Sequence, residues 1–255
     1  MIHPTAIVSP KARLAPDVEI GPYTVIADDV EIGPKTKIGS SCFIDEGARI
    51  GAEVQIFHGA VVSGQPQDLK YAGEKTFFHV GDKTIIREFV TLHRGTSATG
   101  KSEVGKNCLL MAYTHVAHDC RVGDHVIMAN FAQLGGHVKI GDWAIIGGGT
   151  VVHQFCKVGG HVMVGGGFRI TQDLVPYALA AGYPLKVLGI NKVGLERRGF
   201  QKETITALER AFRYLFRGRL NTSQAVEKMK AEFDSLPEIK ELLDFIAAAE
   251  RGLIK

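Results

Sequence analysis

The sequence lacks any long apolar run: nothing in its 255 residues approaches the roughly 18 to 20 consecutive apolar residues of a membrane-spanning helix. Residues 1–4 lack the basic residues and the apolar segment of a secretory signal. Thirty Lys and Arg nearly balance 27 Asp and Glu, and a net charge of +3 is too weak to predict a nucleic-acid partner. We therefore expect a cytoplasmic globular protein with no integral membrane segment.

Proline is scarce, with 9 residues, whereas glycine is abundant, with 30. The glycines belong to a repeat in which an aliphatic residue recurs at every sixth position, from Val8 to Val62 and, after two breaks, from Val104 to Ile170. A period of six fits neither an amphipathic helix nor an extended amphipathic strand. It fits a chain coiled as a three-sided prism, with the aliphatic side chains pointing inward. The repeat therefore predicts an all-β parallel β-helix.

The four cysteines fit the same register. Each is the fourth residue after an aliphatic one, at a position that is otherwise small and faces inward; they are Cys42, Cys108, Cys120 and Cys156. A cysteine in such a place behaves as a small buried hydrophobe. We therefore expect no disulfide framework and no thiolate metal site. For the chain as a whole we also expect no cofactor.

The breaks and the end of the repeat outline the domains. We expect a β-helix over residues 1–184, with inserted loops at about 63–79 and 97–103, and loops of this kind often carry function. Over 185–255 the apolar spacing changes to that of helices, which predicts a small α-helical C-terminal domain. Within it, residues 186–219 hold nine Lys/Arg against three Asp/Glu, a local balance of +6 that suits an acidic partner.

The histidines are the most informative polar residues. Residues 18 apart are stacked on successive coils about 4.8 Å apart, which places Asp119 beneath His137, with His118 beside it. A ladder of histidines along one edge indicates acid-base chemistry or a metal site. His125, Trp143 and His161 are also 18 apart, and we expect them to form a structural stack.

The chain resembles bacterial UDP-N-acetylglucosamine O-acyltransferases, the family of the first enzyme of lipid A assembly, over nearly its whole length. The segments that carry the resemblance are 67–74, 93–96, 115–120, 152–156 and 195–200. The resemblance implies a left-handed β-helix, a homotrimer, and transfer of an (R)-3-hydroxyacyl chain from acyl carrier protein to the 3-hydroxyl of UDP-N-acetylglucosamine. A hydroxyl needs a base, and neutral imidazole serves near pH 7.

The resemblance also assigns roles to residues. It implies His118 as general base, Asp119 as the residue that orients it, and the Gly136 amide as oxyanion donor. The residues that match the substrate cleft are Asp68, Lys70, His93, His115, His137, His153 and Gln154. The residues that match the nucleotide-binding segment are Asn191, Arg197 and Arg198, with Val193 where the family can have an acidic residue.

The same resemblance places Gly166 at the end of the acyl chain, where a residue without a side chain implies a long chain of about fourteen carbons. Phe168 complicates this expectation, because it occupies a position that is small almost everywhere else in the repeat. We expect it either to point inward as core or to displace the coil and shorten the groove.

Two other classes remain open from the residues themselves. In a trimeric carbonic anhydrase of hexapeptide type, three histidines shared between subunits would hold zinc. In a structural solenoid or binding scaffold, no histidine would be needed for turnover. The resemblance favours the acyltransferase, without a bound metal.

Overall fold

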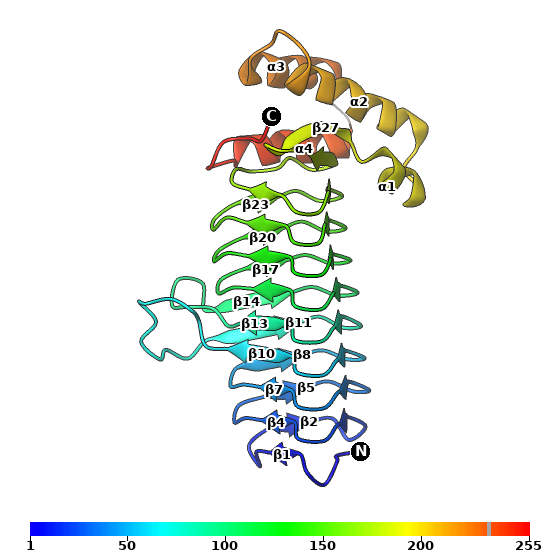
Figure 1. The fold of residues 1–255 in the computed structure, drawn as a ribbon. Helices are drawn as coiled ribbons and strands as arrows, with labels where there is room; N and C mark the ends of the chain where they lie inside the picture. The colour runs from blue at the N-terminus through cyan, green and yellow to red at the C-terminus, as the bar shows by residue number, and fades with distance from the viewer. Residues whose placement is uncertain (234–235) are drawn as a thin grey trace.

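The computed structural model describes residues 1–233 and 236–255. The chain forms a tall stack of coils with helices gathered over its C-terminal end (Figure 1). Short strands form three sheets, in which every pairing but the last is parallel, and strands that pair within a sheet are usually 18 residues apart. The expected fold class, a parallel β-helix followed by helices, is confirmed.

The three sheets take successive strands of each coil in turn. The first sheet contains β1 (Ile7–Val8), β4 (Val25–Ile26), β7 (Phe43–Ile44), β10 (Val61–Gly64), β13 (Thr91–His93), β16 (His115–Val116), β19 (Gln133–Leu134), β22 (Val151–Val152) and β25 (Arg169–Ile170). The second contains β2 (Arg13–Leu14), β5 (Glu31–Ile32), β8 (Ala48–Ile50), β11 (Phe77–Val80), β14 (Lys101–Val104), β17 (Arg121–Val122), β20 (Lys139–Ile140) and β23 (Lys157–Val158). The third contains β3 (Glu19–Ile20), β6 (Lys37–Ile38), β9 (Gln55–Ile56), β12 (Ile85–Ile86), β15 (Leu109–Leu110), β18 (Ile127–Met128), β21 (Ile145–Ile146), β24 (Met163–Val164), β26 (Ala178–Ala181) and β27 (Lys186–Ile190).

The core is a column of the repeated aliphatic residues. Ile44, Leu92 and Leu110 are fully buried, as the inward direction of the repeat predicts. The four cysteines are buried and free, also as predicted. Because each coil buries its aliphatic residues only against its neighbours, the stack is stabilised by its repetition.

Three corners join the sheets, and we number them in chain order. The first corner follows the first sheet, as at 117–120; the second follows the second sheet, as at 123–126; the third follows the third sheet, as at 111–114. At each of these turns one residue has a left-handed backbone, with φ values of 59° at Asp119, 57° at His125 and 62° at Tyr113. Their side chains therefore project at the edges of the prism.

Both inserted segments leave the prism at the first corner. They span residues 65–76, between β10 and β11, and residues 94–100, between β13 and β14, and they project to one side (Figure 1). Their bounds differ from the expected 63–79 and 97–103. The flanks of the insertions are strand, because Phe77–Val80 pairs with Lys101–Val104 along its whole length. The alternation of exposed and buried residues in these strands fits that pairing.

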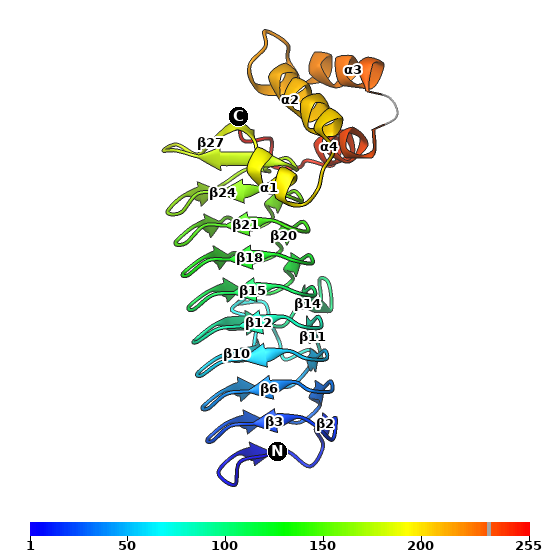
Figure 2. The ribbon, with the colours of Figure 1, turned by 90° about the vertical axis from the view of Figure 1, so that its right-hand side faces the viewer.

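The C-terminal region begins with a strand that the helical spacing did not predict. β27 pairs antiparallel with β26 and so extends the third sheet beyond residue 184. The helices that follow are α1 (Lys192–Arg197), α2 (Lys202–Phe216), α3 (Thr222–Glu232) and α4 (Pro237–Ala247), grouped at one end of the stack (Figure 2). Among the residues that the structure describes, no helix is long and apolar enough to cross a membrane.

Candidate active site

The turn 117–120 at the first corner presents His118 and Asp119 as a hydrogen-bonded pair. His118 Nδ1 lies 2.8 Å from Asp119 Oδ2, and the carboxylate is completely buried whereas the imidazole is 14% exposed. A carboxylate can only accept, so Nδ1 carries the proton of the neutral ring. The Nε2 atom of His118 is therefore left with its lone pair, as a general base requires.

Asp119 is held by the second inserted segment. Its Oδ1 accepts hydrogen bonds from the Thr96 amide and the Thr99 hydroxyl, and its Oδ2 accepts from the Thr96 hydroxyl and from His118. Burial alone would raise the pKa of the Asp119 carboxyl, but the hydrogen bonds from Thr99, His118 and Thr96 outweigh it and hold the pKa below its ordinary value. Asp119 is thus an ionised and fixed acceptor.

The same donor set bears on the metal alternative. The side chains of His118, Asp119 and His137 offer ligand atoms within 4.8 Å of one another, the spacing of a possible cation site. The Asp119 carboxylate, however, has two hydrogen-bond donors at each oxygen, although the Thr99 hydroxyl also has the Lys101 carbonyl as an acceptor. A cation bound by these three residues would have to displace hydrogen bonds that hold Asp119.

Gly136 lies directly against the His118 ring. A Cβ atom at position 136 would lie 2.7 Å from both Cε1 and Nε2 of His118, so any side chain there would displace the imidazole. Gly136 is buried, and within residues 1–233 and 236–255 its amide has no hydrogen-bond acceptor. The Gly136 amide is therefore a donor that the described chain does not use, in a residue that packs against the base.

Three further histidines lie near this pair. The His137 ring packs edge-on against His118, with 5.3 Å between ring centroids, and stacks on Phe155. His93 and His115 pack edge-on against each other at 5.0 Å. Burial, joined by the neighbouring His93, lowers the pKa of His115 to about 4, and burial also lowers the pKa of His93. These two rings are therefore neutral at pH 7.

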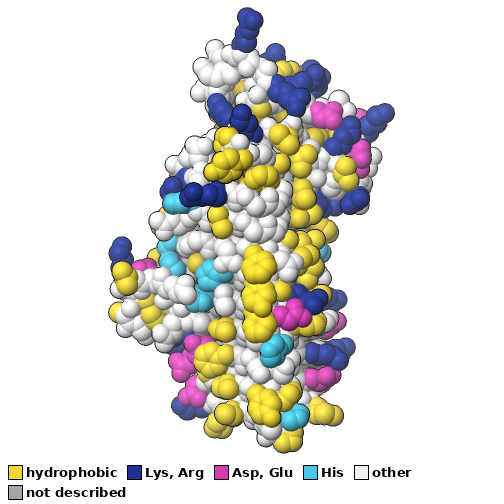
Figure 3. Space-filling model, in the orientation of Figure 1, with side chains coloured by type: hydrophobic (Ala, Val, Ile, Leu, Met, Phe, Trp, Pro, Cys, Tyr) yellow, Lys and Arg dark blue, Asp and Glu magenta, His cyan; other side chains and the backbone are white. Residues whose placement is uncertain are grey.

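His93 has a polar atom to spare: its Nδ1 is buried and has no partner among the described residues. The Nδ1 of His115, in contrast, lies 2.7 Å from the Thr91 hydroxyl. Figure 3 shows histidine side chains at the surface beside the projecting loops. Together these rings provide neutral hydrogen-bonding groups next to the His118–Asp119 pair.

The other residues predicted for the substrate cleft are also at the first corner. His153 and Gln154 are exposed one coil beyond Gly136, and His153 Nδ1 lies 3.1 Å from the Gln154 carbonyl. Asp68 and Lys70 belong to the first inserted segment, where the Lys70 amide donates to the Asp68 carboxylate. The structure therefore brings the predicted base, its orienting carboxylate and the predicted cleft residues to one edge of the prism.

The predicted nucleotide-binding residues lie at a different edge. Asn191 caps α1 and donates to the His161 carbonyl, and Arg198 donates to the Trp143 carbonyl at 3.0 Å, so both fix α1 to the second corner. Arg197 is exposed at the end of α1. The two arginines therefore lie at a helix end. Val193 is exposed on the same helix.

Gly166 lies at the third corner, away from both groups. A Cβ there would lie 2.9 Å from the carbonyl oxygen of Gly148 on the preceding coil, which gives packing a reason for glycine at this position. Phe168 is partly buried against the core, and its ring covers Gly165. Phe168 thus packs inward, the first of the two expected outcomes.

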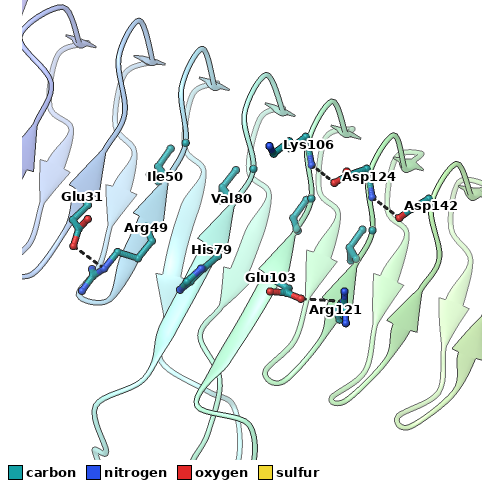
Figure 4. A pocket seen from close by; sticks show the side chains of 16 residues that line it. Glu31, Arg49, Ile50, His79, Val80, Glu103, Lys106, Arg121, Asp124 and Asp142 are labelled. Atoms are coloured by element: carbon teal, nitrogen blue, oxygen red, sulfur yellow. Dashed lines mark hydrogen bonds and ion pairs between the residues drawn. The ribbon is translucent and has the colours of Figure 1, made fainter.

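A groove of about 570 Å³ on the second sheet is lined by charged side chains and contains none of the predicted site residues (Figure 4). Its outward charges pair along the sheet: Arg49 with Glu31, and Arg121 with Glu103. At its upper edge Asp124 and Asp142 each accept from an amide of the preceding coil. This groove is a solvated, charge-paired face of the prism.

The sequence analysis assigned no role to Thr96 or Thr99, although both hold Asp119. Thr96 belongs to the segment 93–96 that carried the resemblance, but no repeat spacing relates it to Asp119, which lies 23 residues further on. The contact arises because the inserted segment folds back over the first corner. The sequence has no pattern that indicates the course of this segment, so the contact between Thr96 and Asp119 could not be predicted.

Comparisons with known proteins agree over the full chain. Residues 173–254 match the family model for the second domain of UDP-N-acetylglucosamine O-acyltransferase, and residues 11–46 and 101–136 match bacterial transferase hexapeptide repeats. An acyl-[acyl-carrier-protein]–UDP-N-acetylglucosamine O-acyltransferase from Thiobacillus denitrificans is 48% identical, over 100% of this chain and 99% of the relative. One from Myxococcus xanthus is 46% identical over the same shares of the two chains.

Solved structures agree as well. The UDP-N-acetylglucosamine acyltransferase LpxA from Bacteroides fragilis superposes with a TM-score of 0.98 at 44% identity, over 100% of both chains. LpxA from Acinetobacter baumannii gives 0.97 at 43% identity, over 100% of this chain and 99% of the other. With this identity, coverage and fold, the chain belongs to the UDP-N-acetylglucosamine O-acyltransferase family, a family of hexapeptide-repeat acyltransferases.

Proposed function

We propose that this enzyme transfers an (R)-3-hydroxyacyl chain from acyl carrier protein to the 3-hydroxyl of UDP-N-acetylglucosamine, the first step of lipid A biosynthesis. The observation that carries the proposal is the arrangement at the first corner. There a histidine with a free Nε2, an orienting carboxylate and an unused amide lie together. An acyl transfer to a hydroxyl needs these three elements.

The reaction begins at His118. Its Nε2 takes the proton of the 3-hydroxyl as the sugar oxygen attacks the thioester carbonyl carbon, and Asp119 stabilises the imidazolium that forms. The carbonyl oxygen becomes negative and accepts a hydrogen bond from the Gly136 amide. When the carbon–sulfur bond breaks, the sulfur leaves with the electron pair and takes the proton from His118. The ester and the free carrier thiol are the products.

The surrounding residues bind the substrates in this proposal. His93, His115, His137, His153 and Gln154 hold the sugar and the thioester, and Asp68 and Lys70 cover them from the first inserted segment. Neutral histidines suit this task, because a neutral ring can hydrogen-bond a sugar hydroxyl without bringing in a charge.

A homotrimer would complete the site. Asn191, Arg197 and Arg198 belong to the second corner and Gly166 to the third, whereas His118 is at the first. Within a cyclic assembly, one protomer's first corner can face another corner of its partner. The outward residues of the third sheet suit such contacts, because a half-buried apolar column runs along it: Ile85, Leu109, Ile127, Ile145 and Met163.

The two charged partners are proposed to bind at cationic residues. Arg197 is exposed and free to meet the diphosphate, for which guanidinium is well suited. Figure 3 shows Lys and Arg side chains gathered over the C-terminal helices. That surface includes the basic stretch 186–219, and we propose that it binds the acidic carrier protein.

Product analysis tests the proposal. The enzyme is incubated with UDP-N-acetylglucosamine and hydroxyacyl carrier proteins of ten, twelve and fourteen carbons, and the product is identified by mass spectrometry. A mono-acylated sugar nucleotide, formed fastest from the fourteen-carbon donor, is expected. A zinc-dependent activity without acyl transfer would favour the carbonic anhydrase class, and no turnover of any kind would favour a scaffold.

Chain length is tested separately with Gly166→Met. Each buried methylene is worth about 0.8 kcal/mol, so blocking two carbons should shift the preference by roughly tenfold. Because a side chain at 166 meets the Gly148 carbonyl, the variant's unfolding temperature is measured alongside. A folded variant with an unchanged preference, or a wild type that already prefers ten carbons, would contradict the proposed role of Gly166.

A further inference from the structure

We propose that Thr96 is a positioning residue for the His118–Asp119 pair. From the second inserted segment, it fixes the rotation of the Asp119 carboxylate, so that Oδ2 of Asp119 stays in line with Nδ1 of His118. The inference rests on the proposed function of His118 and adds to it a residue that, within the part of the chain that the structure describes, has no hydrogen bond to the base or to the predicted cleft residues. Thr96 belongs to the segment 93–96, for which the sequence analysis proposed a role only at His93.

Thr96 grips both oxygens of Asp119. Its amide donates to Oδ1 at 3.0 Å and its hydroxyl donates to Oδ2 at 2.8 Å. Two bonds from one residue to the two oxygens fix the rotation of the carboxylate as well as its position. The direction of the hydroxyl is also set, because the Ala98 amide donates to Thr96 Oγ1 at 3.2 Å. The hydroxyl proton of Thr96 therefore points to Asp119.

Thr96 is itself supported on a rigid turn. It is 7% exposed, and its carbonyl accepts from the Gly100 amide at 2.8 Å. Gly95 packs so closely on Lys101 that a Cβ there would lie 2.5 Å from the Lys101 nitrogen. A side chain that orients another group acts well only if its own backbone is fixed, and this turn meets that condition.

The same support carries the first inserted segment. Arg94 is buried, pairs with Asp45 at 3.0 Å and donates to the Tyr71 hydroxyl. Glu74 of that segment accepts from the Ser97 amide at 3.0 Å. The segment that carries Asp68 and Lys70 is thus hydrogen-bonded to the turn that holds Asp119. Substrate loop and catalytic pair share one scaffold.

The neighbouring hydroxyls are weaker candidates. Thr99 also contacts Asp119, but it is exposed, and its single proton has a second acceptor in the Lys101 carbonyl at 2.7 Å. Ser102 is fully buried nearby, yet its hydroxyl has no partner among the described residues. Ser102 therefore offers a matched control, a buried hydroxyl close in sequence that holds nothing.

The test compares Thr96→Val, which keeps the size of the side chain and loses the hydroxyl, with Thr96→Ser and Ser102→Ala. Losing a hydrogen bond to a charged group predicts that kcat of Thr96→Val falls by about tenfold or more, with KM for UDP-N-acetylglucosamine changed by less than about twofold. Thr96→Ser should retain most of the rate, and Ser102→Ala all of it. If Thr96→Val does not fold, Thr96→Ala is measured in the same way.

A double-mutant cycle separates positioning from general damage. In an Asp119→Asn background, Thr96→Val should lower kcat by less than about twofold, because the acceptor that Thr96 orients has already lost its charge. A full tenfold loss in that background would overturn the inference, as would a wild-type kcat in Thr96→Val itself. His118→Ala is measured in parallel. If His118→Ala keeps the wild-type rate, the proposed function of His118 fails. If His118→Ala loses rate and Thr96→Val does not, only the role of Thr96 is refuted.

Discussion

The first and second corners of the prism are built on the same turn but use it differently. At the second corner, amides of Ala52, Lys106 and Asp124 donate to an aspartate of the next coil, at 2.7 to 2.9 Å. Figure 4 shows two of these caps, at Asp124 and Asp142. A cap of this kind needs a glycine below it: a Cβ at Gly123 would lie 2.1 Å from Asp142 Oδ1.

At the first corner the equivalent amide belongs to Gly136, and the residue 18 positions on is Gln154. No cap forms there among the described residues, and Gly136 packs against the His118 ring. The second corner satisfies the amides of Ala52, Lys106 and Asp124 in this way and uses them as scaffold. The first corner leaves one such amide unsatisfied next to a base, which makes it suited to chemistry. The following predictions test this contrast.

The largest effect is expected for His118→Ala. Removing the base should lower kcat by at least about 10²-fold, with folding and nucleotide binding retained. The matched variant His125→Ala, at the second corner, removes a ring that only stacks on Trp143 and should keep kcat within about twofold. Steady-state acyl transfer checks both, and a His118→Ala enzyme of near wild-type kcat would refute the assignment.

Gly136→Ala should be next. The added methyl lies 2.7 Å from the His118 ring and must displace it, which predicts a loss in kcat of roughly 10- to 100-fold. Gly160→Ala is the control at the second corner, where the nearest atoms to the new Cβ are the Asp142 carbonyl oxygen, at 3.2 Å, and a carboxylate oxygen of Glu241, at 3.3 Å. Equal activities of the two variants would show that Gly136 is not constrained by the base.

Smaller effects are expected for the two arginines: a change in KM for Arg197, and a loss of stability in addition for Arg198. Arg197→Ala should raise KM for the nucleotide or the carrier by roughly three- to tenfold and leave kcat nearly unchanged, since an exposed cation contributes uniform binding. Raising the salt concentration should weaken carrier binding. Arg198→Ala should also lower the unfolding temperature, because it frees α1 from the Trp143 carbonyl. Identical kinetics and stability in both variants would contradict this division.

The smallest effect concerns the pH dependence of stability. Burial, followed by the nearby Arg198, lowers the pKa of His161 from 6.5 to about 4. The unfolded chain therefore binds this proton at a higher pH than the folded chain, and acidification from pH 6.5 to 4 favours unfolding by at most about 3 kcal/mol. Below pH 4 His161 is protonated in both states, so it causes no further loss of stability.

His161→Phe should flatten that part of the stability curve, because it removes the titrating group and keeps the stack. Phe131 shows that this chain accepts phenylalanine in the same left-handed conformation, with a φ of 62° against 58° at His161. Denaturant unfolding between pH 4 and 7 checks the prediction. A variant with the wild-type slope would show that His161 does not contribute to it.

The fold was predictable because one six-residue repeat runs through most of the β-helix sequence. One aliphatic residue in six fixes the inward face, so Ile44 and Leu110 could be placed in the core without a structure. The stacking of Asp119 beneath His137 followed from the same 18-residue spacing, and the structure has these side chains 3.6 Å apart. The strand β27 escaped prediction because it pairs antiparallel, outside the repeat.

The supports of the site were not predictable in this way. Thr96 reaches Asp119 through an inserted segment whose course no period describes. The anchoring of Arg198 on the second corner depends on how α1 packs against the last coils, which helical spacing does not specify. Long-range contacts made by irregular segments had to be seen in three dimensions.

The most direct measurement converts the first corner into the second. Gln154→Asp places a carboxylate 18 residues after Gly136, just as Asp142 lies 18 residues after Asp124 at the second corner. The new carboxylate should accept from the Gly136 amide, as Asp142 accepts from the Asp124 amide. Gln154→Ala is the matched variant that cannot form a cap. Protection of the Gly136 amide from hydrogen exchange shows whether the cap has formed. We predict that Gln154→Asp then loses about 10²-fold in kcat, as for a lost oxyanion donor. Gln154→Ala loses only the proposed substrate contact, so it should raise KM and keep kcat within about threefold. Equal kcat in the two variants, with the cap formed, would contradict the account.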